Sequence, residues 1–155
     1  MPTILFVCTG NLYRSPIAAE AFRDQLMQAG QDAEWTVYSA GLWAPPGQPP
    51  PPQAVELALS HGLLIDEHKT QPLTAELLAK ADLVLVMEEG QKESIKAEFP
   101  FARQKVHLLS QVVEGIVYDI PDPVAANSEA DSIIGELVAM IRAGYMKIYR
   151  IAEAD

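Results

Sequence analysis

The chain of 155 residues contains a single cysteine, Cys8, and this scarcity excludes two common kinds of cysteine chemistry. One cysteine cannot form an intramolecular disulfide, and it cannot supply a metal cluster that needs several thiolates. Because a lone thiol survives best in a reducing compartment, we expect the protein to be cytoplasmic.

Basic residues are also scarce. The chain has 11 lysines and arginines against 21 aspartates and glutamates, which gives a formal net charge of −10 and a pI of about 4.6. Such a chain repels nucleic acid and anionic lipid, so we expect neither as a partner. The first apolar run, residues 4–8, has no basic leader and is too short for a signal peptide or a membrane span. We therefore expect a soluble monomer.

The sequence lacks the common nucleotide and metal motifs. It contains neither G-x-x-x-x-G-K-[ST] nor G-x-G-x-x-G, so no familiar loop for nucleotide phosphates is present. Its three histidines, His61, His68 and His107, show no ligand spacing with cysteine or carboxylate partners. We expect no metal and no cofactor.

What the chain does contain is an alternation of short apolar runs with helical patterns, and 49% of its residues are hydrophobic. The length fits one domain spanning residues 1–155. Strands are predicted at residues 4–7, 35–39, 83–87 and 105–109, and helices at 17–30, 54–61 and 91–99. A closing helix carries a buried stripe through Ile133, Leu137, Ile141 and Ile148, and Ser128 with Asp131 resembles its capping box. This order predicts a three-layer α/β domain with four parallel strands, in which the proline-rich residues 43–52 form a stiff surface loop.

The most informative segment is V-C-T-G-N-L-Y-R-S-P, residues 7–16, which joins the first strand to the first helix. Ligands of open α/β sheets bind at such carboxyl ends of strands. Gly10 and Asn11 tolerate the left-handed conformations in which successive N–H groups point inward at an anion. Ser15 and Pro16 suit the N-cap and the first helical position, so the positive end of the helix would face the loop. We expect a phosphate to be held by Thr9, Gly10, Asn11, Leu12, Tyr13, Arg14 and Ser15.

The same segment suits nucleophilic catalysis. A cysteine beside an arginine at a helix N-terminus is favoured as a thiolate, and the Ser15 hydroxyl can donate to it. Arg14 follows Cys8 by six positions, so a curled loop can bring its planar guanidinium to two phosphate oxygens at once. The alternative is that Cys8 is only a small buried apolar residue at a strand end.

Four segments together resemble the low-molecular-weight protein tyrosine phosphatases. They are residues 7–16, Ser39-Ala40-Gly41, residues 82–88 ending in Glu88, and Asp122-Pro123. The resemblance implies a phosphatase-I-like fold and hydrolysis of phosphotyrosine in proteins through a cysteinyl-phosphate. It implies that Cys8 is the nucleophile, Arg14 the phosphate ligand and Asp122 the general acid. The implied partner is a phosphotyrosine-containing protein, for which a tyrosine kinase is one candidate.

The resemblance also implies a polar network bracing the loop, formed by Asn11, Ser15, Ser39 and His68. Three positions depart from the family pattern. Tyr13 stands where many members have a second cysteine, Val124 follows Asp122-Pro123 where aromatic residues are usual, and Gln71 stands where arginine is frequent. A wall for the substrate ring is expected from Leu12, Tyr13, Trp43 and Val124.

Some alternatives remain open at this point. Asp119 lies three residues from Asp122 and is a rival for the acid. An arsenate reductase resolved by a small external thiol would use the same loop, and so would a catalytically silent phosphate or phosphopeptide reader.

Overall fold

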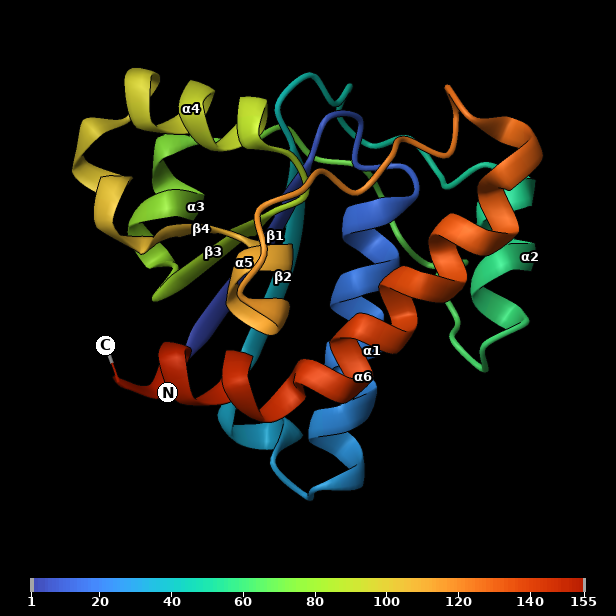
Figure 1. The fold of residues 1–155 in the computed structure, drawn as a ribbon, viewed down its shortest axis with the longest axis horizontal. Coiled ribbons are helices and arrows are strands. Elements are labelled where there is room, and N and C mark those ends of the chain that lie inside the picture. Colours follow the sequence, from blue (N-terminus) through green and yellow to red (C-terminus); the bar gives the residue numbers. More distant parts are fainter. Residues whose placement is uncertain (1, 155) are drawn as a thin grey trace.

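A four-stranded, wholly parallel sheet lies at the centre of the molecule (Figure 1). The computed structural model describes residues 2–154, apart from the side chain of Asn127, so the ends of the predicted 1–155 domain, Met1 and Asp155, lie outside the described residues. The strands are β1 (Thr3–Cys8), β2 (Thr36–Gly41), β3 (Leu83–Val86) and β4 (Val106–Leu108), in the spatial order β2-β1-β3-β4. The prediction of an α/β fold with four parallel strands is confirmed.

Helices cover both faces of this sheet (Figure 1). Their bounds are α1 (Arg14–Gln28), α2 (Pro52–Leu59), α3 (Ala75–Lys80), α4 (Glu89–Glu98), α5 (Leu109–Glu114) and α6 (Ala130–Ala154). Short 3-10 turns are η1 (Asp32–Glu34), η2 (Pro100–Lys105) and η3 (Asn127–Glu129). Helices α1, α2, α5 and α6 share one core with the sheet, and α3 and α4 share the other, which gives the three layers.

The two cores explain why the first strand reads as a continuous apolar run. Side chains of a strand alternate between its faces, so Ile4 and Phe6 pack on the α1 side while Leu5 and Val7 pack on the α4 side. All four are fully buried. The strand that carries Cys8 is therefore held from both faces, which fixes the position of its carboxyl end.

Some predicted boundaries are wrong. Helix α1 begins at Arg14 with Tyr13 as its N-cap, so Ser15 lies inside the first turn and is not the N-cap. Its hydroxyl contacts Cys8 Sγ, Asn11 Nδ2 and the carbonyl of Ala40 and does not cap the helix. Ser128 lies in η3, two residues before α6 begins, so it is not the N-cap of α6 either. Helices α3 and α5, six residues each, were not predicted, because they are too short to show a helical period.

The strand order creates a place for a ligand. From β1 the chain passes through α1 to β2 on one side, and it later returns to β3 on the other side of β1. Strand β1 is followed by α1 on one face of the sheet, and its neighbour β3 is followed by α4 on the other face. The two connections therefore diverge at the carboxyl ends of β1 and β3, which is where open α/β sheets bind their ligands.

Candidate active site

The loop after β1 curls around the sulfur of Cys8. The backbone N–H of Asn11 points at Cys8 Sγ at 3.3 Å, and the Ser15 hydroxyl lies 3.0 Å from the same sulfur. Asn11 has a φ of 58°, the left-handed conformation that lets the loop turn its N–H groups inward. The Asn11 N–H, the Ser15 hydroxyl and the N-terminus of α1 thus lie around the sulfur.

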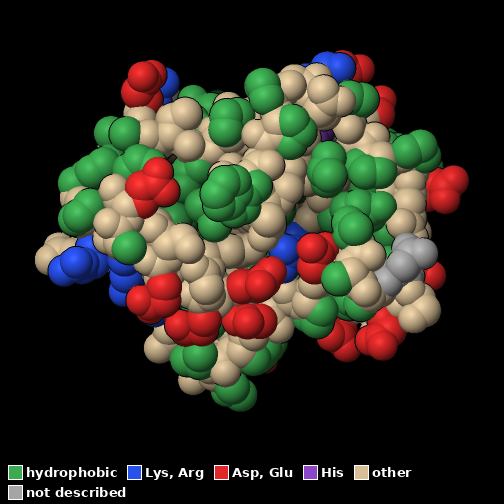
Figure 2. Space-filling view, turned by 90° about the horizontal axis from the view of Figure 1, so that it is seen from above, with side chains coloured by type: hydrophobic (Ala, Val, Ile, Leu, Met, Phe, Trp, Pro, Cys, Tyr) green, Lys and Arg blue, Asp and Glu red, His purple; other side chains and the backbone are tan. Residues whose placement is uncertain are grey.

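A cavity of about 180 Å³ opens above this sulfur. Its lining brings together the nucleophile candidate, the loop, the arginine and the acid candidate: Cys8, Thr9, Gly10, Leu12, Tyr13, Arg14, Asp122 and Val124. Viewed from the carboxyl end of the sheet, a basic side chain is recessed near the middle of the face, with acidic side chains beside it (Figure 2).

The guanidinium of Arg14 is held by hydrogen bonds from one of its nitrogens. Its Nη1 donates to Glu88 Oε2 at 2.6 Å and to the carbonyl of Ile120 at 2.8 Å, and the Arg14 side chain is only 3% exposed. No residue in the part of the chain that the structure describes accepts a hydrogen bond from Nε or Nη2. These two donors are therefore available to two oxygens of one anion.

A buried polar network braces the loop. Asn11 is fully buried, and its Nδ2 donates to Ser15 Oγ at 2.8 Å and to Ser39 Oγ at 3.0 Å. Its Oδ1 accepts from the backbone N–H of Gln71 at 2.9 Å, and its carbonyl lies 2.8 Å from His68 Nε2. The structure thus brings together the four residues predicted to brace the loop. The network offsets the strain of a left-handed, non-glycine residue.

His68 is held in a half-buried position against the loop. Burial lowers the pKa of His68, and this effect outweighs the hydrogen bond to the Asn11 carbonyl, which raises it. The nearby positive charge of Arg23 lowers the pKa further. The neutral ring is thus favoured near pH 7, and it donates from Nε2 to the loop.

Of the two candidate acids, only Asp122 lies at the cavity. Its Oδ1 accepts from the N–H of Val124 at 2.9 Å, which orients the carboxyl group within its turn. Asp119 is exposed, and its Oδ1 caps the N-terminus of α4 by accepting from Glu89 N at 2.8 Å. The geometry therefore favours Asp122 as the group that reaches a bound phosphate.

The expected substrate wall is assembled only in part. Leu12, Tyr13 and Val124 line the cavity, whereas Trp43 does not and is 82% exposed. The Tyr13 hydroxyl donates to Gln53 Oε1 at 2.9 Å. Burial and then the negative charge of Asp122 raise the pKa of Tyr13, so the phenol stays neutral beside the acid.

Three residues of the site were not assigned roles from the sequence: Glu88, Gln91 and Gln71. Glu88 was noted only as the acidic residue after the third strand, yet it pairs with Arg14. Gln91 accepts at Oε1 from the backbone N–H groups of Met87 and Glu88 and donates from Nε2 to Thr9 Oγ1 at 3.1 Å. The E-x-x-Q spacing of residues 88–91 is a variant of the capping box and was the available signal. Gln71 supports the loop through its backbone N–H, which donates to Asn11 Oδ1, and through its side-chain Nε2, which donates to the Ser39 carbonyl at 2.9 Å.

Within residues 2–154, no group of three or more His, Cys, Asp or Glu side chains could hold a metal ion. No helix of that same range is long and apolar enough to cross a membrane.

Comparisons with known proteins show what this chain is similar to. Residues 3–151 match the family model described as low molecular weight phosphotyrosine protein phosphatase. The chain is 39% identical to the probable low molecular weight protein-tyrosine-phosphatase EpsP of Ralstonia solanacearum, over 92% of this chain and 90% of that protein. It is also 39% identical to the protein-arginine-phosphatase of Bacillus subtilis (strain 168), over 77% of this chain and 78% of that protein. A solved structure of the YwlE arginine phosphatase, a mutant with a phosphorylated active-site serine, matches with a TM-score of 0.87 and 33% identity, over 96% of this chain and 99% of that one.

Proposed function

Because this chain belongs to the low molecular weight phosphotyrosine protein phosphatase family, we propose that it hydrolyses phosphotyrosine in proteins through a covalent phosphocysteine on Cys8. As a member of this family the chain is a phosphatase. The covalent mechanism through Cys8 and the phosphotyrosine substrate are what we propose. The observation that carries it is the single cavity in which the Cys8 sulfur, the Arg14 guanidinium and the Asp122 carboxyl group meet.

The first step transfers the phosphoryl group to sulfur. The Cys8 thiolate attacks phosphorus in line with the leaving phenoxide, so a P–S bond forms as the P–O bond breaks. The free Nε and Nη2 of Arg14 and the inward N–H groups of the loop stabilise charge on the three equatorial oxygens. Protonated Asp122 gives its proton to the leaving oxygen, which departs as a neutral phenol.

The second step regenerates the enzyme. Asp122, now ionised, takes a proton from a water molecule that attacks phosphorus, and the P–S bond breaks to release inorganic phosphate. The Ser15 hydroxyl, 3.0 Å from Cys8 Sγ, donates to the departing thiolate. Positive charge from Arg14 and the backbone dipoles supplies the electrostatic stabilisation for both steps.

The cavity lining favours phosphotyrosine over phosphoarginine. The names of the relatives include phosphatases of both kinds. Leu12, Tyr13 and Val124 give the cavity a wall that suits a neutral phenyl ring. A cationic guanidinium leaving group would be desolvated against that wall with Asp122 as the one acidic residue of the lining. Arginine phosphatase activity is the second candidate, supported by the identity to the Bacillus subtilis protein.

Two assays test this proposal. Metal-free protein should release nitrophenolate from p-nitrophenyl phosphate, and Cys8→Ser should reduce turnover at least about 1,000-fold. Asp122→Asn should slow turnover more for basic leaving groups such as phenol than for nitrophenol, because a poor leaving group depends more on the acid. No turnover by reduced parent protein, or full turnover by Cys8→Ser, would contradict the mechanism. Faster turnover of a phosphoarginine peptide than of the matched phosphotyrosine peptide would contradict the substrate assignment.

A further inference from the structure

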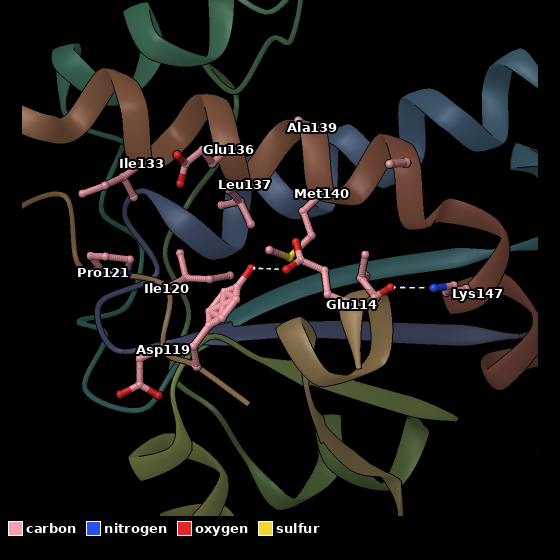
Figure 3. A pocket seen from close by; sticks show the side chains of 13 residues that line it. Glu114, Asp119, Ile120, Pro121, Ile133, Glu136, Leu137, Ala139, Met140 and Lys147 are labelled. Atoms are coloured by element: carbon pink, nitrogen blue, oxygen red, sulfur yellow. Dashed lines mark hydrogen bonds between the residues drawn. The ribbon is translucent and has the colours of Figure 1, made fainter. Parts of the chain in front are cut away.

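A second cavity lies beside the active site but outside it. It has a volume of about 540 Å³, within the range of sites that hold small organic ligands. It lies between α5, the segment Tyr118–Pro121 and α6. Its apolar surface comes from Val113, Ile120, Ile133, Leu137 and Met140. Figure 3 shows Leu137 and Met140 pointing from α6 toward Ile120 across this space.

The charges around the cavity are mostly negative. Three carboxylates line it, from Glu114, Asp119 and Glu136, against the single ammonium group of Lys147. Lys147 already donates to the carbonyl of Val113 at 2.7 Å and lies at the opposite end from Asp119 and Glu136 (Figure 3). Among the described residues, the Glu136 carboxylate has no hydrogen-bond or ion-pair partner, so this end of the cavity can receive a positive charge.

The pKa of Tyr118, which also lines the cavity, reflects the same excess of negative charge. Its hydroxyl donates to Glu114 Oε1 at 2.8 Å. Its pKa is raised to about 12, first by burial, then by this hydrogen bond and by the negative charges of Glu114 and Glu136. A cation in the cavity would meet a negative potential that no neighbouring cation neutralises at that end.

The cavity is joined to the active site through one short segment. The side chain of Ile120 lies in the cavity, whereas its carbonyl accepts from Arg14 Nη1 at 2.8 Å and its N–H donates to the Met87 carbonyl at 2.9 Å. The acid candidate, Asp122, follows two residues later. Any ligand that displaces Ile120 therefore acts on both the guanidinium and the acid.

We propose that this cavity binds a small organic cation with an apolar body, and that the bound ligand alters turnover through Ile120. The apolar body would pack on Ile120, Leu137 and Met140, and the cationic group would face Glu136. The effect on turnover rests on the proposed function, whereas the binding itself does not.

Binding is tested with 4-phenylbutylamine, followed through the amide signals of the ¹⁵N-labelled protein by NMR. Neutral 4-phenylbutanol and anionic 4-phenylbutyrate serve as matched probes. We expect saturable shifts confined to α5, residues 118–121 and α6, with the amine bound more tightly than the alcohol and the acid bound least. Glu136→Gln should weaken amine binding about two- to fivefold and leave alcohol binding unchanged, while Glu153→Gln, an exposed acid on the same helix outside the cavity, changes neither.

Filling the cavity gives a second test. Ala139 is exposed on α6 and lines the cavity, so Ala139→Phe should abolish binding of amine and alcohol alike, whereas Ser132→Phe on the same helix should preserve it. Saturating amine should change kcat for p-nitrophenyl phosphate without competing with inorganic phosphate. Equal binding of the three probes, or shifts centred on residues 8–15, would overturn the site. Specific binding with unchanged kcat in an active enzyme would overturn the coupling through Ile120.

Discussion

Gly41 is the position where the addition of one methyl group tests how closely the loop of residues 9–13 must be placed. It ends β2 directly beside Cys8 in the sheet register. A Cβ built at Gly41 would lie 2.7 Å from the carbonyl oxygen of Thr9, 2.9 Å from the backbone nitrogen of Asn11 and 2.9 Å from Ala44 Cβ. Two of these three neighbours are backbone atoms of the loop. Gly41→Ala must therefore push the loop by about half an ångström to reach ordinary contact distances.

The size of the effect follows from this displacement. Overpacking of a well-packed site typically costs about 1–3 kcal/mol, so the free energy of unfolding should fall by that amount. Misplacement of reacting groups by up to an ångström can cost about 100-fold in rate, so kcat/KM should fall between about 10- and 100-fold. Urea unfolding measures the first quantity, and turnover of p-nitrophenyl phosphate measures the second.

Gly144 provides the matched control. A Cβ there would lie 2.6 Å from both Cγ atoms of Val113, so Gly144→Ala introduces a comparable clash between α6 and α5. This clash should lower stability and leave kcat/KM within about twofold, because it displaces no loop atom. Unchanged turnover in Gly41→Ala, or an equal loss of turnover in Gly144→Ala, would contradict a specific effect of Gly41 on the loop.

Three further predictions concern the groups behind the loop. Asn11→Gly keeps the left-handed backbone but removes three side-chain hydrogen bonds, so it should lower the free energy of unfolding by about 2–3 kcal/mol. Asn11→Ala should lower it further, because alanine adds backbone strain at this φ. Urea unfolding of the two variants measures both effects. Glu88→Ala leaves the buried guanidinium of Arg14 with one acceptor and should lower stability by about 1.5–3 kcal/mol together with kcat/KM, whereas exposed Glu93→Ala should change neither. Because the pKa of His68 is lower in the folded chain than its ordinary value of 6.5, its contribution to stability is full above about pH 6.5 and is lost as the pH falls through the folded pKa. The difference in unfolding midpoint between the parent and His68→Gln should therefore shrink between pH 7 and pH 5, and a constant difference would contradict this assignment.

The sequence predicted the elements that have a strong periodic signal. The first and third strands, buried on both faces, read as unbroken apolar runs, and α6 reads as a long amphipathic stripe. Helices α3 and α5 were not predicted from the sequence, because six residues complete fewer than two turns and the stability of such short helices comes from packing on the sheet. The start of α1 was misplaced because the Ser15-Pro16 pair imitates a cap, whereas the loop uses the Ser15 hydroxyl at the sulfur of Cys8.

Candidate site residues could be predicted from the sequence where they lie close together in the chain. Cys8, Gly10, Asn11 and Arg14 share one short loop, and their types and spacing suffice to suggest an anion site. Partners from distant segments were not predictable in the same way, because only the fold brings them near.

Glu88 is separated from Arg14 by 74 residues, and its role depends on β1 and β3 being neighbours in the sheet. Gln71 donates its backbone N–H to Asn11 Oδ1, which any residue other than proline could do, and its side-chain Nε2 to the Ser39 carbonyl, a contact that depends on the fold. The sequence also could not show that Asp119 caps α4 while Asp122 reaches the cavity, since both lie on one irregular segment.

The proposed transfer of phosphate through a covalent bond to Cys8 can be tested by trapping the phosphoenzyme. Asp122→Asn, mixed with p-nitrophenyl phosphate and quenched during turnover, should accumulate phosphoenzyme because loss of the base slows the second step for this good leaving group. Proteolysis and mass spectrometry should locate one phosphoryl group on the peptide that contains Cys8, and none in the Cys8→Ala form of the same variant. Turnover without a phosphoryl group on Cys8, or a phosphoryl group on another residue, would contradict a phosphocysteine intermediate.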